Sequence, residues 1–106
     1  MNRNPIFEQE FVSIIQIIKF LEEDHQKRDC KTTLKRKNFF YSILNGLPAK
    51  EICEKFEIKT CRSSEYVQKV LRRICGYAGV ESAPRVKKIK RYGDIFINFV
   101  EKDFIK

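Results

Sequence analysis

A chain of 106 residues can form one domain with a single hydrophobic core, and its 42% hydrophobic content leaves little margin beyond that core. The formal net charge of +8 predicts attraction to a polyanion, meaning nucleic acid, an acidic membrane or an acidic protein. No apolar run approaches the roughly 18 residues of a membrane span, and no signal peptide opens the chain, so we expect a cytoplasmic protein without a membrane partner.

The positive charge is concentrated in one part of the chain. Residues 59–91 contain ten Lys and Arg against two Glu, whereas the remaining residues contain 12 basic and 12 acidic side chains. The whole surplus therefore falls within this stretch. This distribution predicts a localised basic surface.

Cysteine and histidine usage indicates neither a metal centre nor catalysis. The four cysteines form no CxxC pair, and His25 is distant in sequence from the last three of them, so we expect no zinc site and no cofactor. Cys53 and Cys75 instead read as small core residues with free thiols. Without a Gly-rich phosphate loop or paired carboxylates near a base, we expect the protein not to be an enzyme.

The first predicted helix runs from residue 5 to about residue 26, because Asn4-Pro5 is a good helix start and apolar residues then recur at helical spacing. The expected core stripe is Phe7, Phe11, Ile14, Ile15, Ile18 and Leu21. Val12, Ile17 and Phe20 widen this stripe to much of the circumference. Such a helix needs cover on more than one side, from the domain itself or from a second chain, which would make the protein a homodimer.

Two shorter helices follow a polar connection, "HQKRDCKTTLKRKN". The second helix is expected to include Leu34 and to end at Asn45-Gly46, a common stop signal. The third, about ten residues long, takes Pro48 into its first turn and ends near Ile58. Its predicted core residues are Ile52, Cys53 and Phe56.

The fourth predicted helix has one apolar and one charged face. "KTCRSS" forms the turn before it, and Ser63 or Ser64 is expected to cap its start. Val67, Val70, Leu71 and Ile74 form an apolar stripe, and Gly76 and Gly79 end the helix. The residues expected to face outward are Ser64, Glu65, Gln68, Lys69, Arg72 and Arg73.

The last stretch, residues 83–106, is a basic and then apolar extension. "SAPRVKKIKRY" predicts a helix from Pro84, interrupted at Gly93-Asp94. "IFINFVEKDFIK" fits a strand or a helix, and Asp94 as a helix cap favours the helix. We therefore predict an all-α fold of about five helices in one domain spanning residues 1–106, with N-terminal helices in 5–45 and a pair of helices in 48–76.

This helix pair resembles a known DNA-binding motif. "NGLPAKEICEKFEI" followed by "EYVQKVLRRI" is similar to the helix-turn-helix of bacterial transcription regulators, loosely like PapB-type pilus-operon regulators and LuxR-type DNA-binding domains. Cys53 matches the small residue inside the first helix, and Val67 the branched residue early in the second. The likeness covers residues 43–80. It departs from the pattern at Glu57, where the motif usually has Gly, and in having about four more residues between the helices.

The resemblance and the charge distribution together predict sequence-specific binding of double-stranded DNA by a transcriptional regulator associated with the nucleoid. A homodimer would present two reading helices about one duplex turn apart and would require a roughly palindromic site. The alternative is that the charged side of the fourth predicted helix is an ordinary solvent-exposed face of a core helix and contacts no DNA. The predicted DNA-binding residues are Arg62, Ser64, Glu65, Gln68, Lys69, Arg72, Arg73, Arg85, Lys87, Lys88, Lys90 and Arg91.

A second hypothesis is an interaction protein or coregulator. Here the apolar C-terminal segment would dock on RNA polymerase or another regulator, with Phe96, Phe99 and Phe104 as anchors, because large apolar side chains usually dominate interface energy. Binding of RNA through the tyrosines is a third interpretation. No RRM-like or KH-like signature places those tyrosines together on one platform.

Overall fold

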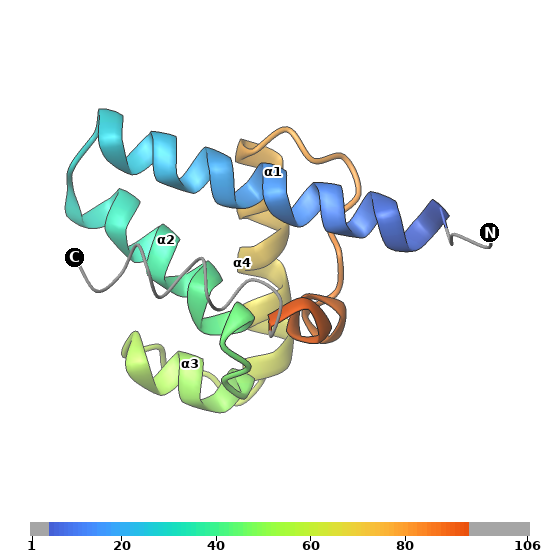
Figure 1. Cartoon of the computed structure of the whole chain (residues 1–106). Helices are drawn as coiled ribbons and strands as arrows, with labels where there is room; N and C mark the ends of the chain where they lie inside the picture. Colours follow the sequence, from blue (N-terminus) through green and yellow to red (C-terminus); the bar gives the residue numbers. More distant parts are fainter. Residues whose placement is uncertain (1–4, 94–106) are drawn as a thin grey trace.

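The computed structural model describes the backbone of residues 5–93 and the side chains of residues 9–93, and this part of the chain is all-α (Figure 1). The helices are α1 (Pro5–Lys27), α2 (Lys31–Leu44), α3 (Ala49–Lys55) and α4 (Ser63–Tyr77), and residues 86–93 form a further helical segment. Residues 5–93 contain no strand. The predicted fold class is therefore confirmed. None of the described helices is long and apolar enough to cross a membrane.

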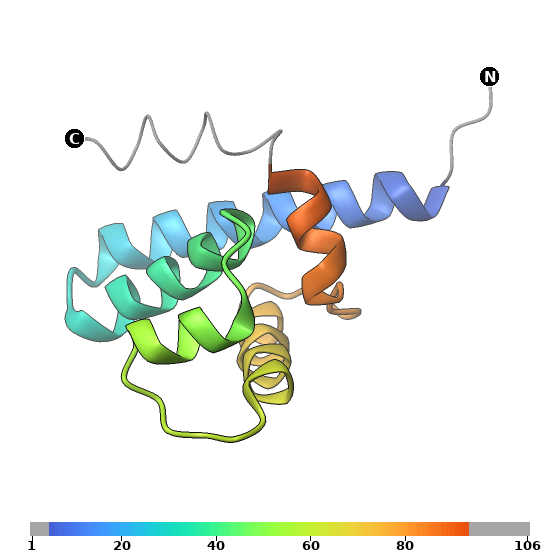
Figure 2. The same cartoon turned by 90° about the horizontal axis from the view of Figure 1, so that it is seen from below.

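The four helices pack in two pairs. α1 and α2 form an antiparallel hairpin, while α3 packs against both α2 and α4 (Figure 1). α4 crosses α1 steeply, so that the hairpin lies over one end of α4 and α3 lies beside the other (Figures 1 and 2). Residues 86–93 contact both α1 and α4, and they cross α1 at a steep angle (Figure 2).

One core joins all these elements. Every helix contributes fully or almost fully buried side chains, and the predicted core roles of Cys53 and Cys75 are confirmed. The prediction for Ile15 was wrong, because Ile15 is 44% exposed and Ile17 is buried in its place. The core includes Ile14, Ile17, Leu21, Phe40, Ile43, Leu44, Ile52, Cys53, Val67, Leu71, Ile74, Cys75, Ile89 and Tyr92. α1 is apolar on so many sides that sequence spacing alone did not identify its buried stripe.

α2 begins earlier than predicted. The polar connection ends at Cys30, whose extended backbone makes it the cap residue of α2, and the helix starts at Lys31. Thr33 fixes this start, because its hydroxyl oxygen accepts from the Cys30 N–H at 3.4 Å and its hydroxyl donates to the Arg28 carbonyl. Because of these hydrogen bonds, α2 begins within the polar stretch that was expected to be a connection.

The connection between α3 and α4 spans residues 56–62, longer than the three or four residues of a compact helix-turn-helix. Glu57 adopts φ +57, the left-handed conformation that favours Gly, at the position where the motif usually has that residue. Pro48 is the cap residue of α3, just outside the helix. Ser63 is the first residue of α4 and does not cap it. The cap position is Arg62, whose N–H donates to the Thr60 hydroxyl at 3.1 Å.

Of the two glycines predicted to end α4, only Gly79 lies at a turn, and the interruption predicted at Gly93-Asp94 falls at the limit of the described residues. Gly76 lies inside α4, which continues to Tyr77, and the chain turns at Gly79 with φ +77. Gly93 belongs to the helical segment 86–93 and packs on the end of α2, where an added Cβ would lie only 2.1 Å from the Leu44 carbonyl oxygen. The absence of a side chain at Gly93 therefore permits this close approach.

Candidate nucleic-acid interface

α4 has a fully buried side and an exposed, charged side. Val67, Leu71, Ile74 and Cys75 are buried in the core. At 3.6 residues per turn, the opposite arc of the helix carries Glu65, Lys69, Arg72 and Arg73, and all four are exposed. We call these four residues, together with Arg62 and Ser64 at the start of the helix, the α4 face.

The cations of the α4 face are largely available for a ligand. Lys69, Arg72 and Arg73 form no ion pair with any other residue in the described range. Arg62 lies 3.6 Å from Glu65, but the side chains are 74% and 73% exposed, so this surface pair holds neither of them firmly. Ser64 is exposed beside them.

Gln68 does not face outward as expected. Its side chain is half-buried, its Oε1 accepts from the Val86 N–H at 3.1 Å, and its Nε2 lies 3.5 Å from the Pro84 carbonyl oxygen as donor. The amide therefore joins α4 to the chain that enters the helical segment 86–93. We expected Gln68 to face DNA, but in the structure it contacts protein.

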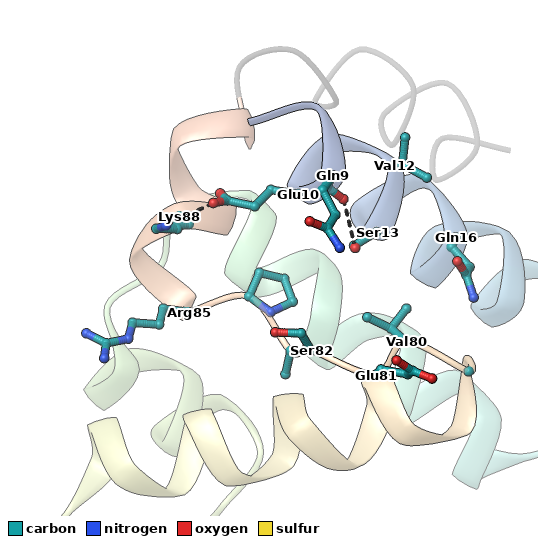
Figure 3. Close-up of a pocket in the computed structure, with 13 residues that line it drawn as sticks. Gln9, Glu10, Val12, Ser13, Gln16, Val80, Glu81, Ser82, Arg85 and Lys88 are labelled. Atoms are coloured by element: carbon teal, nitrogen blue, oxygen red, sulfur yellow. Dashed lines mark hydrogen bonds and ion pairs between the residues drawn. The ribbon is translucent and has the colours of Figure 1, made fainter. Parts of the chain in front are cut away.

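Residues 85–91, which we call the basic segment, lie beside α4. Arg85, Lys87 and Arg91 are exposed, and Lys90 is half-buried. Lys88 is committed to the fold, because its ammonium group lies 2.8 Å from the Glu10 carboxylate of α1 (Figure 3). Figure 3 also shows the Arg85 side chain extending away from Lys88 and Glu10.

The structure thus brings together two of the three predicted sets of site residues, those on α4 and those of the basic segment. The α4 face and the basic segment are linked through Gln68. The predicted partner-binding residues Phe96, Phe99 and Phe104 lie outside the described residues, as does the question of strand or helix in 94–106.

The charges of the α1–α2 hairpin, which the sequence did not single out as a site, form a network. Lys37 Nζ lies 2.8 Å from Glu22 Oε1, and the Tyr41 hydroxyl donates to the same carboxylate oxygen at 2.6 Å. Burial raises the pKa of Glu22, but the hydrogen bonds from Lys37 and Tyr41 outweigh it and hold the pKa below its ordinary value. These charges therefore stabilise the fold.

Arg36 connects this hairpin to α4. Its guanidinium lies 2.7 Å from Asp24 on α1 and 4.5 Å from the centre of the Tyr77 ring, at the end of α4. Both charged side chains are about four-fifths buried, at 21% and 18% exposure. Arg36 is thus a bridge between helices that no spacing rule within one helix would predict.

A groove of about 750 Å³ lies between α1 and the loop that follows α4 (Figure 3). Glu10 and Glu81 contribute negative charge to its lining, and Arg85 and Lys88 contribute positive charge. This mixture gives the groove no single electrostatic preference. We assign no ligand to it.

The thiols do not form a metal centre with other side chains in the described residues, which contain no cluster of three metal-ligating groups. Cys75 is buried, and desolvation raises its pKa to about 11. Cys30 is exposed, and hydrogen bonds from Thr33 lower its pKa. Cys75 is therefore a core thiol.

Comparison with protein-family models, curated proteins and solved structures finds no match to this chain. The functional assignment therefore depends on the residues and their geometry. The relevant features are the exposed cations of α4, the left-handed residue after α3, and the basic segment held beside them.

Proposed function

We propose that this protein is a transcriptional regulator that binds double-stranded DNA sequence-specifically, with the α4 face in the major groove. The observation that carries the proposal is the amphipathic placement of charge on α4. Three cations without ion-pair partners among the described residues lie opposite a fully buried stripe. One side of α4 therefore anchors the helix while the other offers donors to a polyanion.

The dimensions of α4 suit this role. Its 15 residues span about 22 Å, and an α-helix fits the major groove of B-DNA. α3 packs against α4, as the supporting helix of a helix-turn-helix does. The left-handed Glu57 supports the resemblance, because it occupies the turn position that usually carries Gly.

The side chains of the α4 face divide naturally between bases and phosphates. Ser64, Glu65 and Lys69 lie in the first half of α4, the part of a reading helix that usually contacts base edges. Glu can accept from cytosine, and Lys can donate to guanine. Arg72 and Arg73 lie further along and would contact guanine or phosphate.

The basic segment would supply further phosphate contacts. Arg85, Lys87 and Arg91 are exposed and make no ion pair with another described residue, in contrast to Lys88. Phosphate contacts fix orientation without reading sequence, and each releases bound counterions. The basic segment would therefore add affinity rather than specificity, and DNA binding should weaken steeply with salt.

A homodimer through α1 completes the proposal. Ile15 and Val12, which also lines the groove, remain 44% and 59% exposed on this helix. Pairing of two chains would cover them and present two α4 faces to one duplex. The preferred DNA site would then be roughly palindromic.

The test is selection of bound sequences from a random duplex library, followed by affinity measurements across a range of salt concentrations. We expect an enriched motif for the wild-type chain and its loss in the Lys69→Ala/Arg72→Ala variant, with affinity reduced about tenfold or more. The matched control is Lys19→Ala/Lys27→Ala, which removes the same charge from exposed positions on α1. The control should retain the motif.

Two results would contradict the proposal. One is salt-sensitive binding without any enriched motif, which would leave specificity to a protein partner. The other is an equal loss of affinity in both double variants, since only net charge would then matter.

A further inference from the structure

Gln68 makes the contact that joins the two parts of the candidate interface. Its side-chain oxygen accepts the Val86 N–H at 3.1 Å, and its side-chain nitrogen is directed at the Pro84 carbonyl oxygen at 3.5 Å. Gln68 lies on α4 one turn before Arg72 of the α4 face. One amide thus holds the start of residues 86–93 beside the charged side of α4.

We infer that Gln68 is a positioning residue that fixes the basic segment relative to the α4 face, so that both elements engage one DNA duplex as a rigid unit. This inference rests on the proposed function. It assigns Gln68 a role different from base reading, because both ends of its amide are already occupied by backbone groups of the same chain.

The contact satisfies a specific need of the backbone. The first N–H groups of a helix have no partner within that helix, and Val86 is the first residue of the helical segment 86–93. The Gln68 oxygen supplies this partner from a different helix. If Gln68 turned toward DNA, the half-buried Val86 would lose its acceptor.

Other contacts set the rotation of the segment. Ile89 and Tyr92 are buried in the core, and Lys88 pairs with Glu10 of α1 at 2.8 Å. With these side chains facing the protein, Lys87 and Arg91 face outward. Gln68 fixes the start of the segment, and its inward residues fix its orientation, so the outward cations are placed before DNA binds.

Preorganised cations should contribute more to binding than mobile ones, because less conformational freedom is lost when the complex forms. Removal of the Gln68 contact should therefore diminish what Lys87 contributes to DNA affinity. It should leave the bases recognised by α4 unchanged, because phosphate contacts carry no direct sequence information.

The decisive experiment is a double-mutant cycle on DNA affinity with Gln68→Met and Lys87→Ala. Met has a similar length to Gln, but it has no N–H to donate to the Pro84 carbonyl and only a weakly accepting sulfur for the Val86 N–H. In the wild-type background, Lys87→Ala should weaken binding several-fold and reduce the salt slope by about one. In the Gln68→Met background, Lys87→Ala should reduce DNA affinity by less than about twofold, and the selected motif should stay the same.

A measurement without DNA tests the contact itself. Amide hydrogen exchange of Val86 in the free protein should accelerate about tenfold or more in Gln68→Met, while exchange of the core amide of Leu71 stays the same. The matched control is Gln16→Met, which removes a different glutamine hydrogen bond, the one to the Ala78 carbonyl oxygen at 2.9 Å. This control should leave Val86 exchange unchanged.

The outcomes separate this inference from the proposed function. Three results would overturn the role of Gln68 while leaving base reading by α4 intact. The first is an equal loss of DNA affinity on Lys87→Ala in both backgrounds. The others are an altered motif in Gln68→Met and unchanged Val86 exchange. If Lys69→Ala/Arg72→Ala has no effect on DNA binding, the proposed function fails, and with it the role of Gln68 in DNA binding. Accelerated Val86 exchange would then report only a structural contact.

Discussion

Two cations of the α1–α2 hairpin and three cations of α4 have opposite surroundings. In the hairpin, Lys37 and Arg36 lie 2.8 Å and 2.7 Å from carboxylates of α1. On α4, Lys69, Arg72 and Arg73 reach no carboxylate among the described residues. Lys37 and Arg36 therefore support the fold, whereas Lys69, Arg72 and Arg73 remain available to an external polyanion.

The two helix pairs also differ in how they are connected. The hairpin turns within residues 28–30, and Thr33 bonds back to Cys30 and Arg28. The α3–α4 connection is longer and includes the left-handed Glu57. Thus the Thr33 side chain ties the first connection to the start of α2, whereas the second connection is longer and contains a residue in the left-handed conformation.

The largest effect is expected from removing one cation from the α1–α2 hairpin and comparing the result with removal of one cation from α4. Arg36→Met would leave Asp24, whose side chain is 18% exposed, without its partner and would remove the contact with the Tyr77 ring. We expect the free energy of unfolding to fall by about 2–3 kcal/mol, measured by urea denaturation. Arg73→Met, the counterpart on the α4 face, should change it by less than about 0.5 kcal/mol.

A similar loss in both variants would break the comparison. It would mean that Arg73 supports the fold as Arg36 does. An unaffected Arg36→Met protein would likewise show that the pair with Asp24 contributes no net stability, as happens for many ion pairs near a surface.

A smaller effect concerns the pH dependence of the hairpin. Hydrogen bonds from Lys37 and Tyr41 hold the pKa of Glu22 below its ordinary value of 4.5 despite the opposing effect of burial. Because the pKa is lower in the folded state, the resulting stabilisation is full above the unfolded pKa and is lost as pH falls through the folded pKa. At pH 7, Glu22→Gln should lower the free energy of unfolding by about 1 kcal/mol.

The difference in unfolding free energy between wild type and Glu22→Gln should disappear as the pH falls below 4.5. Urea denaturation at several pH values measures this difference. Tyr41→Phe removes one of the hydrogen bonds and should reduce the pH dependence without abolishing it. A gap that stays constant down to acidic pH would show that the charge of Glu22 is not what stabilises the hairpin.

Much of the fold could be predicted from sequence because the helical signals are local. Apolar spacing and stop residues identified all four helices, and the end of α2 at Asn45-Gly46 agrees with the structure. The start of α2 could not be predicted in this way. It depends on the Thr33 hydroxyl, which forms hydrogen bonds with Cys30 and Arg28 across the turn. In the sequence, Thr33 is one polar residue among many in the connection.

The candidate interface was predictable only in part, for a related reason. Sequence periodicity placed Lys69, Arg72 and Arg73 on an exposed face, as the structure has them. It could not distinguish Gln68 or Lys88 from these, because their partners, Val86 and Glu10, lie far away in sequence. Whether a polar side chain is available to a ligand depends on such tertiary contacts.

The smallest predicted effect concerns the α3–α4 connection itself, through Glu57→Gly. An L residue at φ +57 carries a steric cost that Gly avoids, although Gly also loses more chain entropy on folding. We expect a net gain of about 0.5 kcal/mol in the free energy of unfolding, measured by urea denaturation. Glu57→Ala removes the same charge but keeps Cβ, and should give no such gain. Equal gains in both variants would identify charge repulsion, rather than backbone conformation, as the cost at this turn.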